Sequence, residues 1–167
     1  MASQLRVDKI VPVDGAPTSG GGGIIQVVST TLTTPTSTTS TSAFEDISGL
    51  SVAITPKFST SKVLLMVSLG SLSTNAQSMG LRLLRGSTQI GGATSTANQS
   101  GFTNVYAAAA YIMSAYHNFL DSPSTTSATT YKLQWRVASG TGYLGQWKDS
   151  TTDYNGSSTI TAMEVSA

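Results

Sequence analysis

Few residues in this chain could support acid–base or nucleophilic chemistry. There is a single histidine, His117, and Ser114 and Asp121 lie close to it in sequence. Serine, histidine and aspartate are the groups of a hydrolytic triad, so a triad is conceivable here. An ordinary, partly exposed strand residue is the simpler interpretation of His117, and we favour it. A chain with one histidine and no cysteine also cannot form a multi-histidine or thiolate zinc site.

Carboxylates could instead act in pairs or bind a cation. The pairs Glu45-Asp46 and Asp149 with Asp153 are close enough in sequence to be considered for glycoside hydrolysis. Adjacent or loop-borne acids more often cap turns. Asp149 and Asp153 could also hold calcium, but their loop lacks the dense oxygen ligands of a calcium motif. We therefore expect a non-enzymatic protein with no catalytic residue, no bound metal and no cofactor.

Three aromatic residues are candidates for a binding surface. Tyr143, Trp147 and Tyr154 fall in one stretch rich in Gly and Ser. Exposed rings beside short polar groups can stack on the faces of sugars, which indicates saccharide binding. The alternative is that these rings pack in a subunit interface, where aromatic side chains are enriched.

The polarity of the chain comes from hydroxyl groups rather than from charge. The 167 residues include 26 serines and 25 threonines, and only 10% are charged, against about 25% in an average domain. Threonine is β-branched and suits a pleated, half-exposed surface, so the composition favours an all-β fold. Low charge also means little self-repulsion, which favours a component packed among identical neighbours.

The distribution of charge and of apolar residues argues against two classes of partner. Nine basic and eight acidic residues leave a net charge of +1, and the basic residues are scattered. Nucleic acid is an unfavourable partner because phosphate binding needs clustered cations. The longest apolar run, 105–113, is far shorter than the roughly 20 residues that span a bilayer, and the start of the chain has no apolar signal region. We expect a soluble protein without membrane insertion, made in a cytoplasm.

Residues 1–23 are expected to form an arm and a hinge. The arm carries a short apolar set consisting of Leu5, Val7, Ile10, Val11 and Val13. The hinge is the run Gly20, Gly21, Gly22 and Gly23. Consecutive glycines are too costly in backbone entropy for a regular element, so the arm can be oriented independently of the rest. No Lys-Ser or Lys-Thr follows the glycines, which argues against a phosphate-binding loop.

Residues 24–167 are expected to form one β-rich domain. Alternation of apolar and polar residues predicts strands at 50–54, 79–84, 131–137 and 158–165. The largely apolar segments 24–28 and 63–69 are two further strand candidates. Arg85-Gly86-Ser87 predicts a hairpin into 88–90. In 131–137 the inward face is expected to be Tyr131, Leu133, Trp135 and Val137. The continuous apolar run 63–69 is expected to be covered on both sides.

Two segments allow alternatives. The Ser- and Thr-rich stretch 29–42 fits either disorder or a solvent-facing loop or edge strand, and we favour the second because Thr dominates. Segment 105–120 fits a helix or one or two strands, and we favour strands because Asn104 is the only candidate N-cap. Several short strands separated by turn residues predict a sandwich or jelly roll.

The sequence also resembles a class of structural proteins of tailed bacteriophages. The opening Gln4-Leu5-Arg6-Val7-Asp8-Lys9-Ile10 looks like the short arm that precedes a glycine-rich joint in many tail-fibre and appendage proteins. The body is similar to small domains of marine podoviruses and other tailed phages that are related in outline to the complement and tumour-necrosis-factor jelly roll. The matching segments are 44–56, 61–64, 84–88, 120–126, 130–134 and 158–165.

The resemblance implies a trimeric jelly-roll β-sandwich in the virion, and it supplies no catalytic residues. The expected function is that of a fibre or appendage component attached to other virion proteins of the tail or capsid through its N-terminal arm. The alternatives are a capsid (head) decoration protein of the same fold and a module that binds a host receptor or a host-surface glycan. Three arms on one homotrimer would provide avidity for the docking site.

Overall fold

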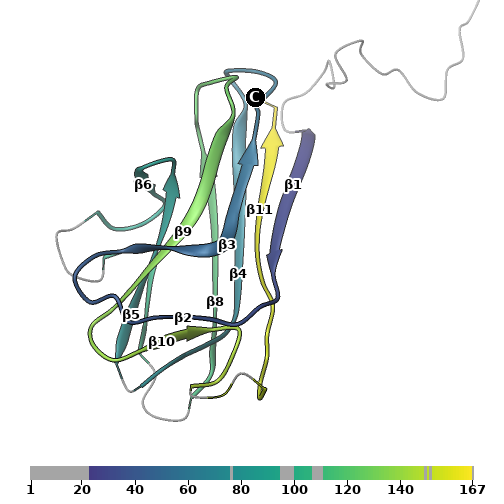
Figure 1. Cartoon of the computed structure of the whole chain (residues 1–167). Coiled ribbons are helices and arrows are strands. Elements are labelled where there is room, and N and C mark those ends of the chain that lie inside the picture. The colour runs from purple at the N-terminus through teal and green to yellow at the C-terminus, as the bar shows by residue number, and fades with distance from the viewer. Residues whose placement is uncertain are drawn as a thin grey trace, which may run out of the picture.

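The computed structural model describes residues 23–75, 77–94, 100–106, 111–148, 150 and 152–166. Within these ranges the secondary structure is all-β, with two antiparallel sheets packed face to face as a β-sandwich (Figure 1). The strands in these ranges are β1 (Ile24–Leu32), β2 (Thr36–Thr38), β3 (Glu45–Ile54), β4 (Lys62–Thr74), β5 (Ser78–Arg85), β6 (Thr88–Ile90), β7 (Thr103–Tyr106), β8 (Met113–Asp121), β9 (Thr129–Val137), β10 (Gly142–Leu144) and β11 (Ser158–Val165).

The first sheet is built around the long strand β4. One edge of β4 pairs with β11 and, further along, with β10, whereas its other edge pairs with β8. Strand β1 pairs with β11, and β2 pairs with β10. The second sheet is built around β5, which pairs with β9 on one edge and with β6 and β7 on the other, while β3 pairs with β9.

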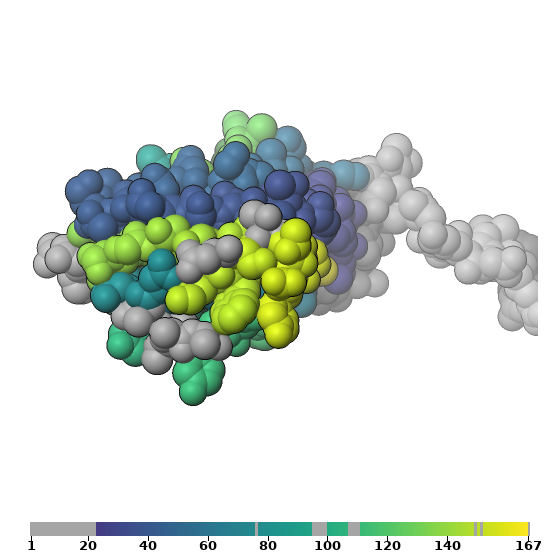
Figure 2. All heavy atoms as spheres, turned by 60° about the horizontal axis from the view of Figure 1, so that its bottom comes forward, coloured from purple at the N-terminus to yellow at the C-terminus, as the bar shows by residue number. Residues whose placement is uncertain are grey.

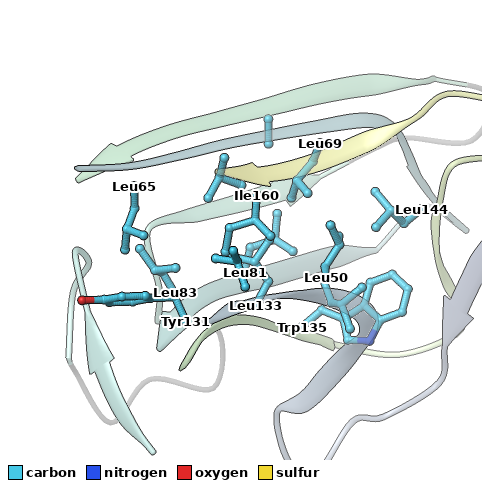
Figure 3. Packing of buried hydrophobic residues seen from close by; sticks show 14 of the residues in the cluster. Leu50, Leu65, Leu69, Leu81, Leu83, Tyr131, Leu133, Trp135, Leu144 and Ile160 are labelled. Carbon is cyan, nitrogen blue, oxygen red and sulfur yellow. The ribbon is translucent and has the colours of Figure 1, made fainter. Parts of the chain in front are cut away.

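The core lies between the two sheets, and the alternation of the strands explains which residues reach it. In β9 the predicted inward set Tyr131, Leu133, Trp135 and Val137 is buried, and in β3 Leu50, Val52 and Ile54 are buried. Figure 3 shows side chains from both sheets meeting in this layer, among them Leu65 and Ile160 from one sheet and Leu81 and Leu133 from the other. The β-sandwich predicted from composition and alternation is therefore confirmed.

Both ambiguous segments contain strands. Residues 29–32 continue β1 and residues 36–38 form β2, each at an end of the first sheet, as expected for an edge strand. Segment 105–120 contributes the end of β7 and most of β8, and residues 107–110 lie outside the described residues. The predicted hairpin joins β5 to β6, where Gly86 has the positive φ of 59° that a two-residue hairpin turn requires.

The strand predicted at 63–69 is present in β4, but the prediction that both of its sides are covered was wrong for the single chain. Residues 63–69 were expected to be covered on both sides, but only the inward set Val63, Leu65, Val67 and Leu69 is buried. On the opposite face Leu64 is half-buried and Met66 is exposed. An antiparallel sheet can face solvent on one side, so a run of apolar residues does not by itself show that both sides are covered.

Both ends of the described chain lie at one end of the sandwich. Gly23, which was predicted to belong to the hinge, exchanges two hydrogen bonds with Ser166, from the Gly23 amide to the Ser166 hydroxyl (3.2 Å) and from the Ser166 amide to the Gly23 carbonyl (2.9 Å). The arm residues 1–19 and Gly20, Gly21 and Gly22 lie outside the described residues. In the described part of the chain no helix is long and apolar enough to cross a membrane.

Candidate functional site

The structure does not bring Ser114, His117 and Asp121 together as a triad. All three belong to β8, where successive side chains point to opposite faces, so the exposed Ser114 and the half-buried His117 are on different sides of the sheet. His117 stacks between Phe102 and Phe119, with ring centroids 4.5 Å and 6.4 Å away. Burial lowers the pKa of His117, partly offset by a backbone hydrogen bond with Gly91. His117 is a neutral packing residue at physiological pH.

Asp121, the last residue of β8, has a structural role. Arg85 Nη1 donates to both of its carboxylate oxygens at 2.9 Å, and the Tyr131 hydroxyl donates to Oδ2 at 2.7 Å. Burial, followed by the hydrogen bond to Asp121, raises the pKa of Tyr131 well above its usual range. The ion pair and the phenol fasten β8 of one sheet to β5 and β9 of the other.

The structure places the other described acidic candidates in separate local contacts. Asp46 pairs with Lys132 at 2.8 Å and accepts a hydrogen bond from Gln134, and these contacts, with that to Lys132 the larger, lower its pKa. Asp153 accepts a hydrogen bond from Ser150 at 3.0 Å, and Asp149 lies outside the described residues. No group of three or more His, Asp or Glu side chains converges within those residues.

Glu164 is a buried carboxylate that the sequence did not indicate. It is fully buried on the inward face of β11, and its Oε2 accepts from Gln26 Nε2 at 2.5 Å. Its Oε1 accepts from the backbone amides of Lys57 (2.8 Å) and Phe58 (3.4 Å). Burial raises its pKa, but hydrogen bonding by Gln26, then by Ser61 and then by the two backbone amides outweighs burial, so the pKa is lowered. The carboxylate therefore holds the turn between β3 and β4 onto β1 and β11.

The predicted aromatic residues separate into two places. Trp147 and Tyr154 make an edge-to-face contact, with ring centroids 5.7 Å apart and planes at 83°. Together with Tyr111 and Ile112 they line a hollow of about 380 Å³, which we call the aromatic hollow. Tyr143 is buried in β10 and is not among the described residues that line the hollow. Tyr111 and Ile112 were not predicted, because they lie more than 30 positions away in sequence and only the packing of loops brings them near.

A second surface stands out on the outer face of the first sheet. Six apolar side chains on β1, β4, β8 and β11 point away from the core there, and we call them the apolar face: Val27, Leu64, Met66, Tyr116, Leu120 and Met163. Tyr116 is 71% exposed, Val27 52%, Leu120 48% and Met66 41%. A hollow of about 470 Å³ lies on this face beside Tyr116, and Met66, Ser68, Asn118, Thr159, Thr161 and Met163 help to line it.

Comparison with known proteins adds no relative: no protein-family model and no curated protein sequence matches the chain.

Proposed function

We propose that this chain is a non-enzymatic structural protein that assembles as a homotrimer through the apolar face. On the resemblance of its segments we further propose that it is a fibre or appendage component of a tailed-phage virion. The observation that carries the assembly proposal is the contrast between the two outer faces of the sandwich.

The outer face of the second sheet is suited to water. It carries Arg82, Lys132 and Arg136, and the first of these lies 3.6 Å from the centre of the Phe44 ring as a cation–π contact. Lys132 is paired with Asp46. This face has charge, ion pairing and hydrogen bonding, so it gains little by being covered.

The apolar face has the opposite character. Its apolar residues are surrounded by hydroxyl and amide side chains, namely Ser29, Thr31, Ser68, Ser114, Asn118, Thr159 and Thr161. Among the described outward residues of these four strands the only charged one is Lys62, at the start of β4. A monomer that left this patch in water would expose a contiguous apolar surface of the kind that marks an interface. The patch has almost no charge, so two copies of it do not repel each other.

The relief of the apolar face also suits a second copy of the chain. The Tyr116 ring stands next to the hollow lined by Met66 and Met163. A protruding aromatic ring beside a flexible, methionine-lined depression allows a projecting side chain of one copy to enter the depression of another. Aromatic and methionine side chains are enriched in interfaces.

The order of the strands supports the finer fold assignment in this proposal. Apart from the three-residue strands β2, β6 and β10, the strands run β1-β11-β4-β8 in one sheet and β3-β9-β5-β7 in the other, and the chain crosses between the sheets at most connections. Two four-stranded sheets connected in this way are the arrangement of a jelly roll. The apolar face does not decide the number of copies, because a symmetric dimer and a symmetric trimer can both bury it. We take three copies from the resemblance.

The proposed attachment follows from where the chain enters the sandwich. Gly23 is fixed to Ser166, so residues before it leave from that end. The arm would dock on another virion protein through Leu5, Val7, Ile10, Val11 and Val13. Three arms on one trimer would give avidity. Removing residues 1–18 should leave an assembled protein that no longer binds virions, whether the site is on the tail or on the head. Retained binding would refute the docking role of the arm.

The assembly test is light scattering on purified full-length protein. We expect a mass three times the 17.2 kDa of one chain. Met66→Lys places a charge in the centre of the apolar face, where burying it costs several kcal/mol, and should reduce the mass to that of a monomer. Ala53→Lys is the matched control, because Ala53 is exposed on the outer face of the second sheet.

Circular dichroism on both variants serves as the control that each is folded. A monomeric wild-type protein would overturn the proposal. An unchanged trimer in Met66→Lys would place the interface elsewhere.

A further inference from the structure

The aromatic hollow lies at the end of the sandwich away from the start of the described chain. Ile24 pairs with Val165 at one end of β11, whereas Tyr154 precedes Ser158 at the other. The seven steps from Ser158 to Val165 correspond to about 23 Å at about 3.3 Å per residue. Figure 2 turns this end toward the viewer, with the segments near residue 147 in yellow-green and near residue 154 in yellow side by side.

Tyr154 has an unfavourable backbone conformation. Tyr154 has φ of 59°, a left-handed conformation that costs an L-residue with a side chain of order 1 kcal/mol or more. Its side chain is nevertheless 66% exposed, so burial of the ring does not compensate for the strain. The surrounding loop determines this conformation through hydrogen bonds from the Gly156 amide to the Gly145 carbonyl (3.2 Å) and from the Trp147 amide to the Asp153 carbonyl (3.4 Å). Backbone strain of this kind clusters at active sites and ligand-binding sites.

The lining of the hollow defines the chemistry of a ligand. Trp147 and Tyr154 form two walls at nearly a right angle, and Tyr111, which is 65% exposed, adds a third ring. The four described lining residues carry no charge, and the polar groups they offer are two phenol hydroxyls and the indole N–H. A fitting ligand therefore has an apolar face for the rings, hydroxyl groups for the edges and no net charge.

We propose that the aromatic hollow is a binding subsite for a neutral saccharide, with a pyranose ring stacked on Trp147 or Tyr154. The volume of about 380 Å³ is at the lower end of the range for ligand sites, which fits one or two sugar units. The site lies at the end of the sandwich opposite the pairing of Gly23 with Ser166. The inference concerns the single subunit, so it is independent of the trimer.

The probes are three neutral trisaccharides: cellotriose, maltotriose and triacetylchitotriose. Binding to the full-length protein is followed by tryptophan fluorescence and by saturation-transfer NMR. We expect at least one of them to bind with a dissociation constant in the millimolar range. Tyr154→Ala and Trp147→Ala should each weaken this binding at least tenfold, whereas Tyr154→Phe should retain it because the ring remains.

Tyr106→Ala is the matched control, since Tyr106 is 63% exposed on β7 and does not line the hollow. Loss of binding in the control would show non-specific adsorption to exposed rings and would overturn the proposal. Tetramethylammonium is tested alongside, and preferential binding of this cation would replace the saccharide by a cation–π ligand. Absence of binding by all three sugars would also overturn the proposal. Light scattering on the same samples reports assembly separately, so failure of this site is distinguishable from failure of the proposed trimer.

Discussion

Glu164 provides the sharpest test of how the sandwich is held together. Glu164→Gln keeps the size and shape of the side chain but removes the charge. The amide oxygen can still accept from the backbone amides of Lys57 and Phe58. Its NH₂ group then faces Gln26 Nε2, which is also a donor. Gln26 cannot turn its amide over without cost, because the same Nε2 donates to the Thr55 carbonyl at 2.7 Å.

The magnitude follows from these contacts. Hydrogen bonds to a charged group contribute about 1.5–3 kcal/mol each and neutral ones about 1 kcal/mol. The variant weakens two bonds and loses one, while it also avoids the desolvation of a buried charge. We therefore expect the free energy of unfolding to fall by about 2 kcal/mol at pH 7. In a chain of this size this corresponds to a decrease in Tm of about 4–8 °C.

The pH dependence identifies the charge as the cause. The pKa of Glu164 is lower in the folded protein than its ordinary value of 4.5. Its contribution to stability is therefore fully present above pH 4.5 and is lost as the pH falls through the folded-state pKa. The difference between wild type and Glu164→Gln should thus be constant near neutral pH and shrink in acid.

The assay is urea unfolding at one fixed protein concentration, followed by tryptophan fluorescence, to which the buried Trp135 contributes. Glu45→Gln is the control, because Glu45 is exposed and its partner, the Thr38 hydroxyl, can also donate to an amide oxygen. The control should lie within about 0.5 kcal/mol of wild type. Equal stability of Glu164→Gln and wild type at pH 7, or a difference that does not change with pH, would refute the reasoning.

Two further perturbations test other buried groups. Asp121→Ala breaks the ion pair with Arg85 and leaves the Tyr131 hydroxyl without its acceptor. The free energy of unfolding in urea should therefore fall by about 3 kcal/mol, against about 1 kcal/mol for Tyr131→Phe. Equal effects of the two substitutions would contradict a role for the ion pair. Burial lowers the pKa of His117 below 6.5, so the wild type should lose stability as the pH falls below 6.5 toward the folded-state value, and His117→Phe should lack this loss when Tm is followed against pH. Identical pH profiles of the two proteins would show that His117 does not titrate on unfolding.

Strand positions were predictable where alternation is clean and one face enters the core. Tyr131 to Val137 is such a case, because every second residue is large and apolar and the others are Lys, Gln or Arg. The hairpin after Arg85 was predictable because Gly86 supplies a conformation that most residues avoid. These signals are local, so they can be recognised without knowledge of the neighbouring strands.

Features that depend on pairing between distant segments could not be predicted. The pairing of β2 with β10 joins residues about 100 positions apart, and neither three-residue strand has an alternation long enough to detect. The burial of Glu164 depends on β1 and on the turn at Lys57 to supply its donors. Tyr111 enters the aromatic hollow for the same reason, since nothing near it in sequence indicates Trp147.

The wrong prediction for residues 63–69 has a physical cause that bears on function. A continuous apolar strand does not by itself show that both of its sides are covered within one chain, because an antiparallel sheet can leave one face open. In β4 the inward side is covered by the second sheet, whereas Leu64 and Met66 face outward together with Leu120 of β8. The sequence thus carries more apolar surface than one copy buries. A second copy that covers the apolar face would bury the outward side of β4, and the Met66→Lys test decides whether it does.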